Sequence, residues 1–291
     1  LRDGPGKGGS FLDLADDWWT FDTTHVGLGD VVRAGTERFD VTSGPYYMYY
    51  SGGNYDTLDR EALSMGSNGT VKGVQMRIGV AASPDGLSWG RIEGEHATGA
   101  VLEVGKEGEF DSLFVAFPTV MPSRDRGDYL MYYSTYDRDA RRYSVGLARS
   151  RDGIQWNKEG MVFRGGPEGS FDDRGASRRH VMHDPEGDGY LMFYECLGSD
   201  GVHRIGLAKS LDGVKWERSS EAPCLDSGAE GSWDEGGVGS PCVVQLEDGR
   251  YRMYYVGMSK ERREDGLPDM RVGVAETPDA TPAAWRRMEQ A

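Results

Sequence analysis

Apolar and polar residues alternate in short stretches along this chain, and the same series of stretches returns four times. A run of the form Tyr-x-Met-aromatic-Tyr is followed by an apolar run around a single Gly, by a turn signal and by a Trp. The copies end at Trp89, Trp156, Trp216 and Trp285. Alternation with a period of two predicts half-buried β-strands. Because one copy cannot bury its own apolar face, the copies are expected to stack against one another.

Each copy is predicted to hold four strands. An aromatic residue followed by Asp stands about ten residues before a valine in every copy, which predicts the same short inner strand around that valine. The pairs are Phe21-Asp22, Phe110-Asp111, Phe171-Asp172 and Trp233-Asp234, and the valines are Val31, Val120, Val181 and Val243. The Tyr-x-Met strand and the glycine-centred strand follow, and in the first three copies an Asp-Gly turn leads into the fourth strand at the Trp, whereas the last copy has a longer turn from Asp279 to Trp285. Four-stranded units repeated around an axis are the blades of a β-propeller, so we predict an all-β propeller with four clear repeats.

The repeat also sets the expected domain boundaries. Residues 1–18, which are glycine-rich from Gly4 to Gly9, are predicted to be a lead-in and connector, and residues 19–291 a single β-propeller domain. The chain opens at Leu1 rather than Met, from which we expect an upstream segment.

Composition excludes several kinds of protein. A formal net charge of −15 argues against binding to a nucleic acid backbone. No apolar run approaches the ~18 residues of a membrane span. The cysteines Cys196, Cys224 and Cys242 have neither zinc nor redox spacing, which favours a reducing compartment, and we expect neither a metal nor a cofactor.

Positions that agree in all copies are interpreted as structural, so candidate functional residues are sought where the copies differ. The third copy is the exception, because its inner strand reads Ser177-Arg-Arg-His-Val-Met-His-Asp184. Arginine and histidine side chains there suit an anionic or heavily hydroxylated ligand. The alternative is that the arginines neutralise neighbouring carboxylates. The candidate binding residues are Arg178, Arg179, His180 and His183, with His25 of the first copy. Spacing along a strand places His180 and His183 on opposite faces, which argues against a metal site.

A second exception ends the Tyr-x-Met strand of the same copy. Glu195 stands where the other copies have Ser51, Ser134 and Val256. Two interpretations stay open: Glu195 is a general acid whose pKa is raised by burial, or it is half of a structural ion pair.

The motifs together resemble a known superfamily. Gly108-Glu-Phe-Asp111, Gly231-Ser-Trp-Asp234, the prolines Pro118 and Pro241 and the Ser-x-Asp-Gly-x-x-Trp turn are similar to those of the glycoside-hydrolase propellers of families 43, 32, 68 and 130, the arabinanases, levansucrases and invertases. The resemblance implies a five-bladed type and carbohydrate chemistry. It extends to uncharacterised plant and algal members, some directed to plastids, which implies a plastid location.

The resemblance also implies a catalytic Asp directly before the inner-strand proline. The corresponding residues here are Leu28, Phe117, Arg178 and Ser240, none of them a carboxylate. Asp30 and Glu195 remain as the acid/base pair that glycoside hydrolysis needs. Two functions therefore stay open. One is an enzyme that hydrolyses or phosphorolyses a glycosidic bond, with a carbohydrate or sugar phosphate as its ligand. The other is a catalytically inactive propeller that binds a glycan or a protein partner.

Overall fold

The computed structural model describes residues 10–34, 44–59, 69–124, 127–264 and 266–288, and every regular element in these residues is a β-strand. The glycine-rich run Gly4 to Gly9 lies outside the described residues. The chain divides into two compact units, residues 1–141 with 145–161 and residues 142–144 with 162–291. The division into a lead-in of residues 1–18 and a propeller domain of residues 19–291 stays a prediction.

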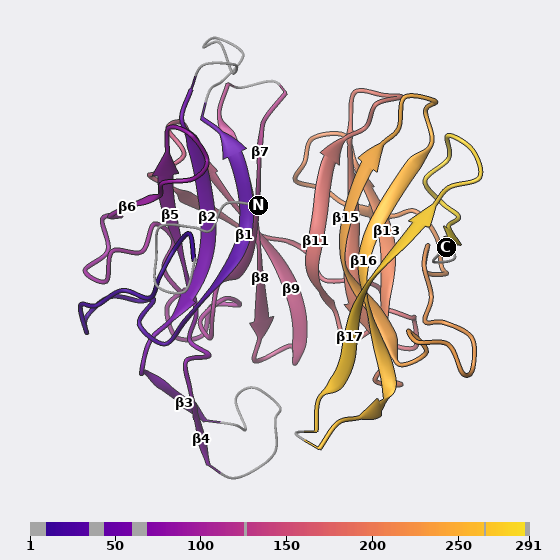
Figure 1. Ribbon diagram of the computed structural model, residues 1–291, viewed down its shortest axis with the longest axis horizontal. Helices are drawn as coiled ribbons and strands as arrows, with labels where there is room; N and C mark the ends of the chain where they lie inside the picture. Colours follow the sequence, from indigo (N-terminus) through magenta and orange to yellow (C-terminus); the bar gives the residue numbers. More distant parts are fainter. Residues whose placement is uncertain (1–9, 35–43, 60–68, 125–126, 265, 289–291) are drawn as a thin grey trace. The chain divides into compact units, whose positions relative to one another are not determined.

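The first unit holds two four-stranded antiparallel sheets, ordered β1-β2-β5-β6 and β7-β8-β9-β10 (Figure 1). The strands of the first sheet are β1 His25–Arg33, β2 Tyr46–Gly53, β5 Arg77–Ser83 and β6 Gly90–Ile92. Those of the second are β7 Ala116–Pro122, β8 Tyr129–Asp137, β9 Arg142–Ser150 and β10 Asn157–Phe163. A hairpin of β3 (Thr57–Asp59) and β4 (Thr70–Lys72) is added to the first copy. β9 and β10 each cross the division between the units.

The second unit repeats this arrangement twice. Its third-copy strands are β11 Ala176–His183, β12 Tyr190–Leu197, β13 His203–Ser210 and β14 Glu217–Arg218. Its fourth-copy strands are β15 Gly237–Gln245, β16 Tyr251–Arg262, β17 Pro268–Glu276 and β18 Arg286–Arg287. A parallel pair between His203 and Gly237 joins the two copies into one sheet. The four predicted repeats are thus four sets of four strands, two of them separate sheets and two joined in one eight-stranded sheet.

All four inner strands keep one register and one irregularity. The repeat valine lies opposite the Met of the second strand in each copy, as Val181 does opposite Met192. Just before that pair every ladder shifts, which is the mark of a β-bulge. The shifts lie between Leu28/Asp30, Ala116/Thr119, Ala176/Arg179 and Gly239/Cys242. The bulge therefore belongs to the repeat, and it sets the direction of the side chains at the start of each inner strand.

The Asp of each aromatic–Asp pair is the hub of a buried polar network. In the third copy Asp172 accepts a hydrogen bond from the Tyr194 hydroxyl at 2.9 Å and forms an ion pair with Arg218 at 2.9 Å. The other copies repeat this with Tyr50–Asp22–Arg91, Tyr133–Asp111–Lys158 and Tyr255–Asp234–Arg287. All four Asp residues are at most 1 % exposed. Because a buried carboxylate needs such partners, this Asp is structural in every copy, as predicted.

The third strand requires its glycine for a close approach. A Cβ at Gly79, Gly146, Gly206 or Gly273 would lie 2.2–2.6 Å from a carbon of the tyrosine ring that binds the Asp. Those tyrosine rings therefore cover bare backbone, which explains why every copy has Gly at this position.

Not every copy buries the same face. Phe193 of β12 is fully buried and packs edge-on against Trp285 at 5.8 Å between ring centroids. Tyr254, at the same register position in β16, is 40 % exposed, and Val272 of β17 is 63 % exposed. The middle strands of the fourth copy, β16 and β17, therefore keep an apolar face outside the core of the second unit.

Candidate functional site

Asp30 lies on β1, and both of its carboxylate oxygens accept hydrogen bonds from backbone N–H groups. One carboxylate oxygen accepts from its neighbour Val31 at 2.8 Å. The other accepts from the backbone N–H of Val120 on β7 at 2.9 Å. Asp30 is half-buried, and it ties the inner strands of two neighbouring copies together.

Glu195 on β12 likewise binds the backbone of a neighbouring inner strand, in the second unit. One of its oxygens, Oε2, accepts the backbone N–H of Ser240 on β15 at 2.8 Å. Ser240 precedes Pro241 and has φ of +50°, in the left-handed region where a non-glycine residue is strained. Glu195 is 7 % exposed, so this hydrogen bond is made away from solvent.

The remaining oxygen of Glu195 binds a histidine. Oε1 lies 2.9 Å from Nδ1 of His203, the first residue of β13. Burial by itself would raise the pKa of the Glu195 carboxyl, but the hydrogen bond and charge of His203, the charge of Arg178 and the N–H of Ser240 bring it below its ordinary value of 4.5. Glu195 is thus ionised at neutral pH, which is opposite to the raised pKa expected of a general acid.

An ionised carboxylate only accepts hydrogen bonds, so Nδ1 of His203 must carry the proton that joins the two side chains. In the neutral imidazole the lone pair is then on Nε2. The His203 side chain is 35 % exposed, whereas Glu195 is buried beneath it. The pair therefore has a buried, charged end at Glu195 and a partly exposed end at the His203 ring.

Arg178 completes this group, which we call the Glu195 cluster: Glu195, His203, Ser240 and Arg178. The exposed Arg178 donates from Nη1 to the Ser240 hydroxyl at 3.1 Å. That hydroxyl lies 3.5 Å from Oε2 of Glu195. The structure thus brings together Glu195 and Arg178, two of the residues singled out in the sequence, with Ser240 between them.

The other candidate residues of the third copy are placed differently. Arg179 is 6 % exposed and lies opposite Tyr194 in the sheet. His180 follows the bulge of β11 and lies opposite Phe193. Burial lowers the pKa of His180 to about 4, so its ring is neutral at pH 7. His183 packs its ring edge-on against Tyr190, with centroids 5.2 Å apart. His25 lies in the first unit, where its Nδ1 is 3.2 Å from the Thr24 hydroxyl.

His203 is the functional candidate that the sequence interpretation missed, although a signal was present. The equivalent position, three residues before the repeat glycine, is Met76, Tyr143 and Met270 in the other copies. A histidine there breaks the repeat just as Glu195 does eight residues earlier. The exceptions singled out in the sequence of the third copy lie on its first and second strands, whereas His203 lies on its third strand.

Two cavities of the second unit lie at other places. One of about 390 Å³ is lined by Tyr190, at the far end of β12 from Glu195, and by Asp184 and Lys215. A larger one of about 880 Å³ lies over β16 and β17 at Tyr254 and Val272. The Glu195 cluster lines neither of these two cavities.

The described residues contain no group of three His, Cys, Asp or Glu side chains placed to hold a metal ion. They also contain no helix long and apolar enough to cross a membrane.

Comparison with solved structures identifies the fold. A glycoside hydrolase superimposes with a TM-score of 0.65 at 17 % identity and covers 97 % of this chain and 77 % of its own. A family 117 glycoside hydrolase of the marine bacterium Zobellia galactanivorans has a TM-score of 0.65 at 15 % identity, over 95 % of this chain and 71 % of its own. The chain has the β-propeller fold of the glycoside hydrolases. This confirms the all-β propeller predicted from the repeat, and also the resemblance to the glycoside-hydrolase propellers.

Sequence comparison adds relatives of this propeller but no family, because no family model matches the chain. The uncharacterized protein Rv1502 of Mycobacterium tuberculosis is 28 % identical over 239 residues, which are 80 % of this chain and 68 % of that protein. An A type blood N-acetyl-α-D-galactosamine deacetylase of Flavonifractor plautii is 24 % identical over 238 residues, 68 % of this chain and 29 % of that protein. The propeller thus has a deacetylase as well as hydrolases among the proteins that it resembles.

Proposed function

We propose that this propeller hydrolyses a carbohydrate bound at the Glu195 cluster, with His203 as the group that takes a proton from water. The observation that carries the proposal is the 2.9 Å contact between Glu195 Oε1 and His203 Nδ1. A base oriented by a buried third group is the recurring arrangement for activating a nucleophile.

The reaction follows from the two ends of this pair. A water molecule at Nε2 of His203 gives its proton to that nitrogen while its oxygen attacks the electrophilic carbon of the substrate. The imidazolium that forms lies against the ionised carboxylate of Glu195, which stabilises its charge. His203 then returns the proton to the departing oxygen or nitrogen, so the cluster is restored at the end of the cycle.

Arg178 and Ser240 supply the substrate contacts in this proposal. The exposed guanidinium of Arg178 has donors for sugar hydroxyl or acyl oxygens. The Ser240 hydroxyl is fixed between Arg178 and Glu195, at 3.1 and 3.5 Å. Arg179, His180 and His183 support the inner strand beneath these groups, and Asp30 holds the inner strands of the first unit.

The bond that is cleaved is either glycosidic or an N-acyl bond of an amino sugar. A single base that also serves as the acid is sufficient for acyl hydrolysis, and the relative named as an N-acetylgalactosamine deacetylase favours it. Glycoside hydrolysis instead uses two carboxyl groups. The products distinguish the two reactions, because hydrolysis of the N-acetyl group releases acetate and glycoside hydrolysis releases a new reducing end.

A binding protein without catalysis is the second candidate. Its support is Asp30, whose carboxylate oxygens accept backbone N–H groups of Val31 and Val120. The four positions that correspond to the catalytic Asp of the similar propellers also lack a carboxylate; they are Leu28, Phe117, Arg178 and Ser240. Such a protein would use Arg178 and Ser240 to hold a glycan and would release no product.

The test is a panel of neutral and N-acetylated oligosaccharides assayed for acetate and for new reducing ends. We expect turnover that falls at least a hundredfold in His203→Met, which introduces the residue found in the first and fourth copies. Met76→His, the reverse change in the first copy, is the matched control and leaves turnover unchanged. Binding of a panel member without product supports the second candidate, and turnover that persists in His203→Met contradicts the first.

A further inference from the structure

A tight turn before the aromatic–Asp pair recurs in all four copies, and one copy differs from the others. The turn is closed by a backbone hydrogen bond, from Thr20 N–H to the Asp17 carbonyl at 3.1 Å in the first copy. The counterparts are Glu109 to Lys106 at 2.9 Å, Ser170 to Pro167 at 3.1 Å and Ser232 to Ala229 at 2.9 Å. The two central residues of the turn are therefore equivalent in all copies.

Those central residues are Glu-Gly in three copies and Trp18-Trp19 in the first. The three glycines, Gly108, Gly169 and Gly231, have φ between +82° and +87°. Trp19 is not among the residues with positive φ, so the first copy closes the turn in another form. Since the Glu-Gly form closes the same turn, the fold does not require tryptophan there.

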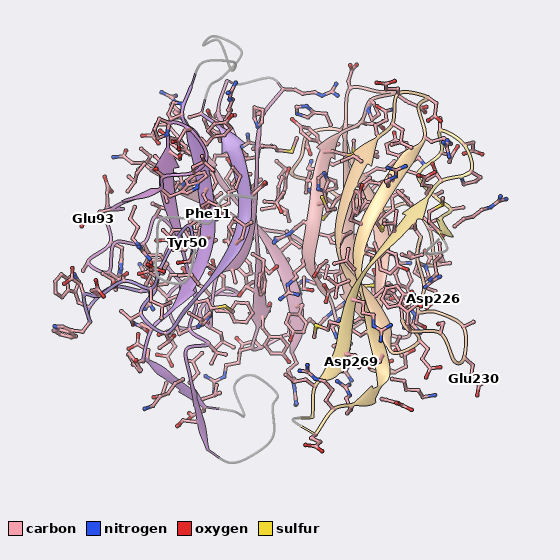
Figure 2. All side chains as sticks on the ribbon, viewed as in Figure 1. Phe11, Tyr50, Glu93, Asp226, Glu230 and Asp269 are labelled. Carbon is pink, nitrogen blue, oxygen red and sulfur yellow. The ribbon has the colours of Figure 1, made fainter. Side chains whose placement is uncertain are left out.

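The two tryptophans are presented to solvent. Trp18 is 82 % exposed and Trp19 50 %, and their rings stand edge to face with centroids 6.2 Å apart. Phe11 and Leu14 of the same segment are 41 % and 44 % exposed. Glu230, the counterpart of Trp18 in the fourth copy, lies at the outer end of its loop (Figure 2). An exposed aromatic group of this kind marks a binding surface rather than a core.

The segment is held in place before any ligand arrives. Arg91 donates to the carbonyl of Asp13 and pairs with the buried Asp22 at 2.8 Å. The backbone N–H of Ala15 donates to the carbonyl of Asp22 at 3.3 Å. A fixed aromatic surface loses little conformational freedom on binding, which favours affinity.

The polar residues around the tryptophans select the ligand. Asp16 and Asp17, directly before the tryptophans, are exposed, and the chain carries a net charge of −15. Carboxylates there repel phosphate, sulfate and anionic membrane surfaces. They accept hydrogen bonds from neutral hydroxyl groups, while the indole faces offer apolar area to the C–H side of a sugar ring.

We propose that Trp18 and Trp19 form a binding site for a neutral polysaccharide, separate from the Glu195 cluster. The site lies wholly in the first unit, and the Glu195 cluster lies in the second. It is independent of the proposed reaction, because it tethers the protein to a polymer and touches no reacting atom.

The repeat supplies the variant that tests this. Trp18→Glu with Trp19→Gly gives the first copy the turn residues of the other three, so the turn still closes. The experiment is electrophoresis of the whole chain through native gels that contain mannan, arabinan, galactan or a β-glucan. We expect wild type to be retarded by at least one polymer, with an affinity at least tenfold higher than that of the double variant. Leu211→Ala, which removes an 86 % exposed apolar side chain of the second unit, is the control and keeps wild-type retardation.

Equal retardation of wild type and the double variant overturns the proposal, and so does the absence of retardation by all four polymers. A concentration-dependent dimer or binding to phosphatidylserine vesicles that the double variant alone abolishes also overturns it, because the occupant is then a second copy or a membrane. The two sites fail separately. His203→Met is expected to keep retardation and lose turnover, whereas the double variant keeps turnover on short oligosaccharides.

Discussion

Ser51 and Glu195 hold the same position in their copies and accept the same hydrogen bond. The Ser51 hydroxyl accepts the backbone N–H of Phe117 at 2.8 Å, and the Glu195 carboxylate accepts that of Ser240 at 2.8 Å. Phe117 and Ser240 are the two residues before an inner-strand proline, with φ of +52° and +50°. The strained residue before the proline is therefore a feature of the fold, and a serine hydroxyl is sufficient to bind its backbone N–H. What Glu195 adds is a second oxygen and a charge, and both are directed to His203.

The charge of Glu195 makes stability depend on pH in a defined direction. Because His203, Arg178 and Ser240 hold the pKa of Glu195 below its ordinary value of 4.5, the folded state binds this proton less readily than the unfolded chain. The stabilisation is present above about pH 4.5 and is lost as the pH falls through the folded-state pKa. Chemical denaturation should show Glu195→Gln less stable than wild type at pH 7, with the difference shrinking below pH 4.5. A difference that grows on acidification would contradict this account.

His180 makes the stability of the fold depend on pH at somewhat higher pH than Glu195 does. Its pKa is lowered by burial to about 4, so between pH 4 and 6.5 the unfolded chain takes up a proton that the folded chain does not. The free energy of unfolding of wild type should therefore fall between pH 6.5 and 4.5, and that of His180→Leu should fall less. Parallel curves for the two proteins would show that His180 is not neutral in the folded state.

The buried Asp networks are expected to stabilise the fold without taking part in function. Asp172→Asn leaves Arg218 and the Tyr194 hydroxyl with a poorer partner, and removing one member of a buried pair costs about 3 kcal/mol. The control is Asp226→Asn, because the Asp226 side chain is 57 % exposed in its pair with Arg204 and a surface pair contributes about 1 kcal/mol or less (Figure 2). Thermal and denaturant unfolding measure both. Equal losses in the two variants would mean that burial of the network is unimportant.

The repeat glycine provides a packing test. In Gly206→Ala the new Cβ would lie 2.3 Å from a carbon of the Tyr194 ring, so the ring must move, and overpacking of this kind costs about 1–3 kcal/mol. Gly90→Ala is the matched control, because a Cβ there meets nothing within 4 Å. Unfolding free energies should separate the two variants. A neutral Gly206→Ala would indicate that the tyrosine does not cover this backbone.

The repeat made the fold predictable from sequence, for a physical reason. Each copy carries its own alternation and its buried Asp, and three of the four carry the Asp-Gly turn, so the same strand pattern is specified repeatedly. Val181 lies opposite Met192 in the sheet, and the equivalent Val and Met lie opposite each other in the other three copies. The five-bladed type and the plant, algal and plastid resemblance stay predictions.

The candidate site was less predictable, because it depends on contacts between copies. In an antiparallel sheet the end of the Tyr-x-Met strand lies beside the start of the inner strand, which places Glu195 near Arg178. No strand pattern indicates that Ser240 of the next copy lies between them. The direction of the Glu195 pKa likewise depends on hydrogen bonds from β13 and β15, which no periodicity reveals. The sequence offered Asp30 as the acid/base partner of Glu195, and it did not reveal that the Asp30 carboxylate accepts the backbone N–H groups of Val31 and Val120.

The central claim is that His203 presents Nε2 to a bound sugar. The chain has five histidines, so the side-chain nitrogen NMR spectrum of protein labelled with ¹⁵N at histidine is simple, and His203→Met assigns the His203 signals by their loss. On addition of a sugar that the panel identifies as a ligand, we predict that the Nε2 signal of His203 shifts, while its Nδ1 keeps the proton shared with Glu195. A saturating sugar that leaves both His203 signals unchanged would contradict the account.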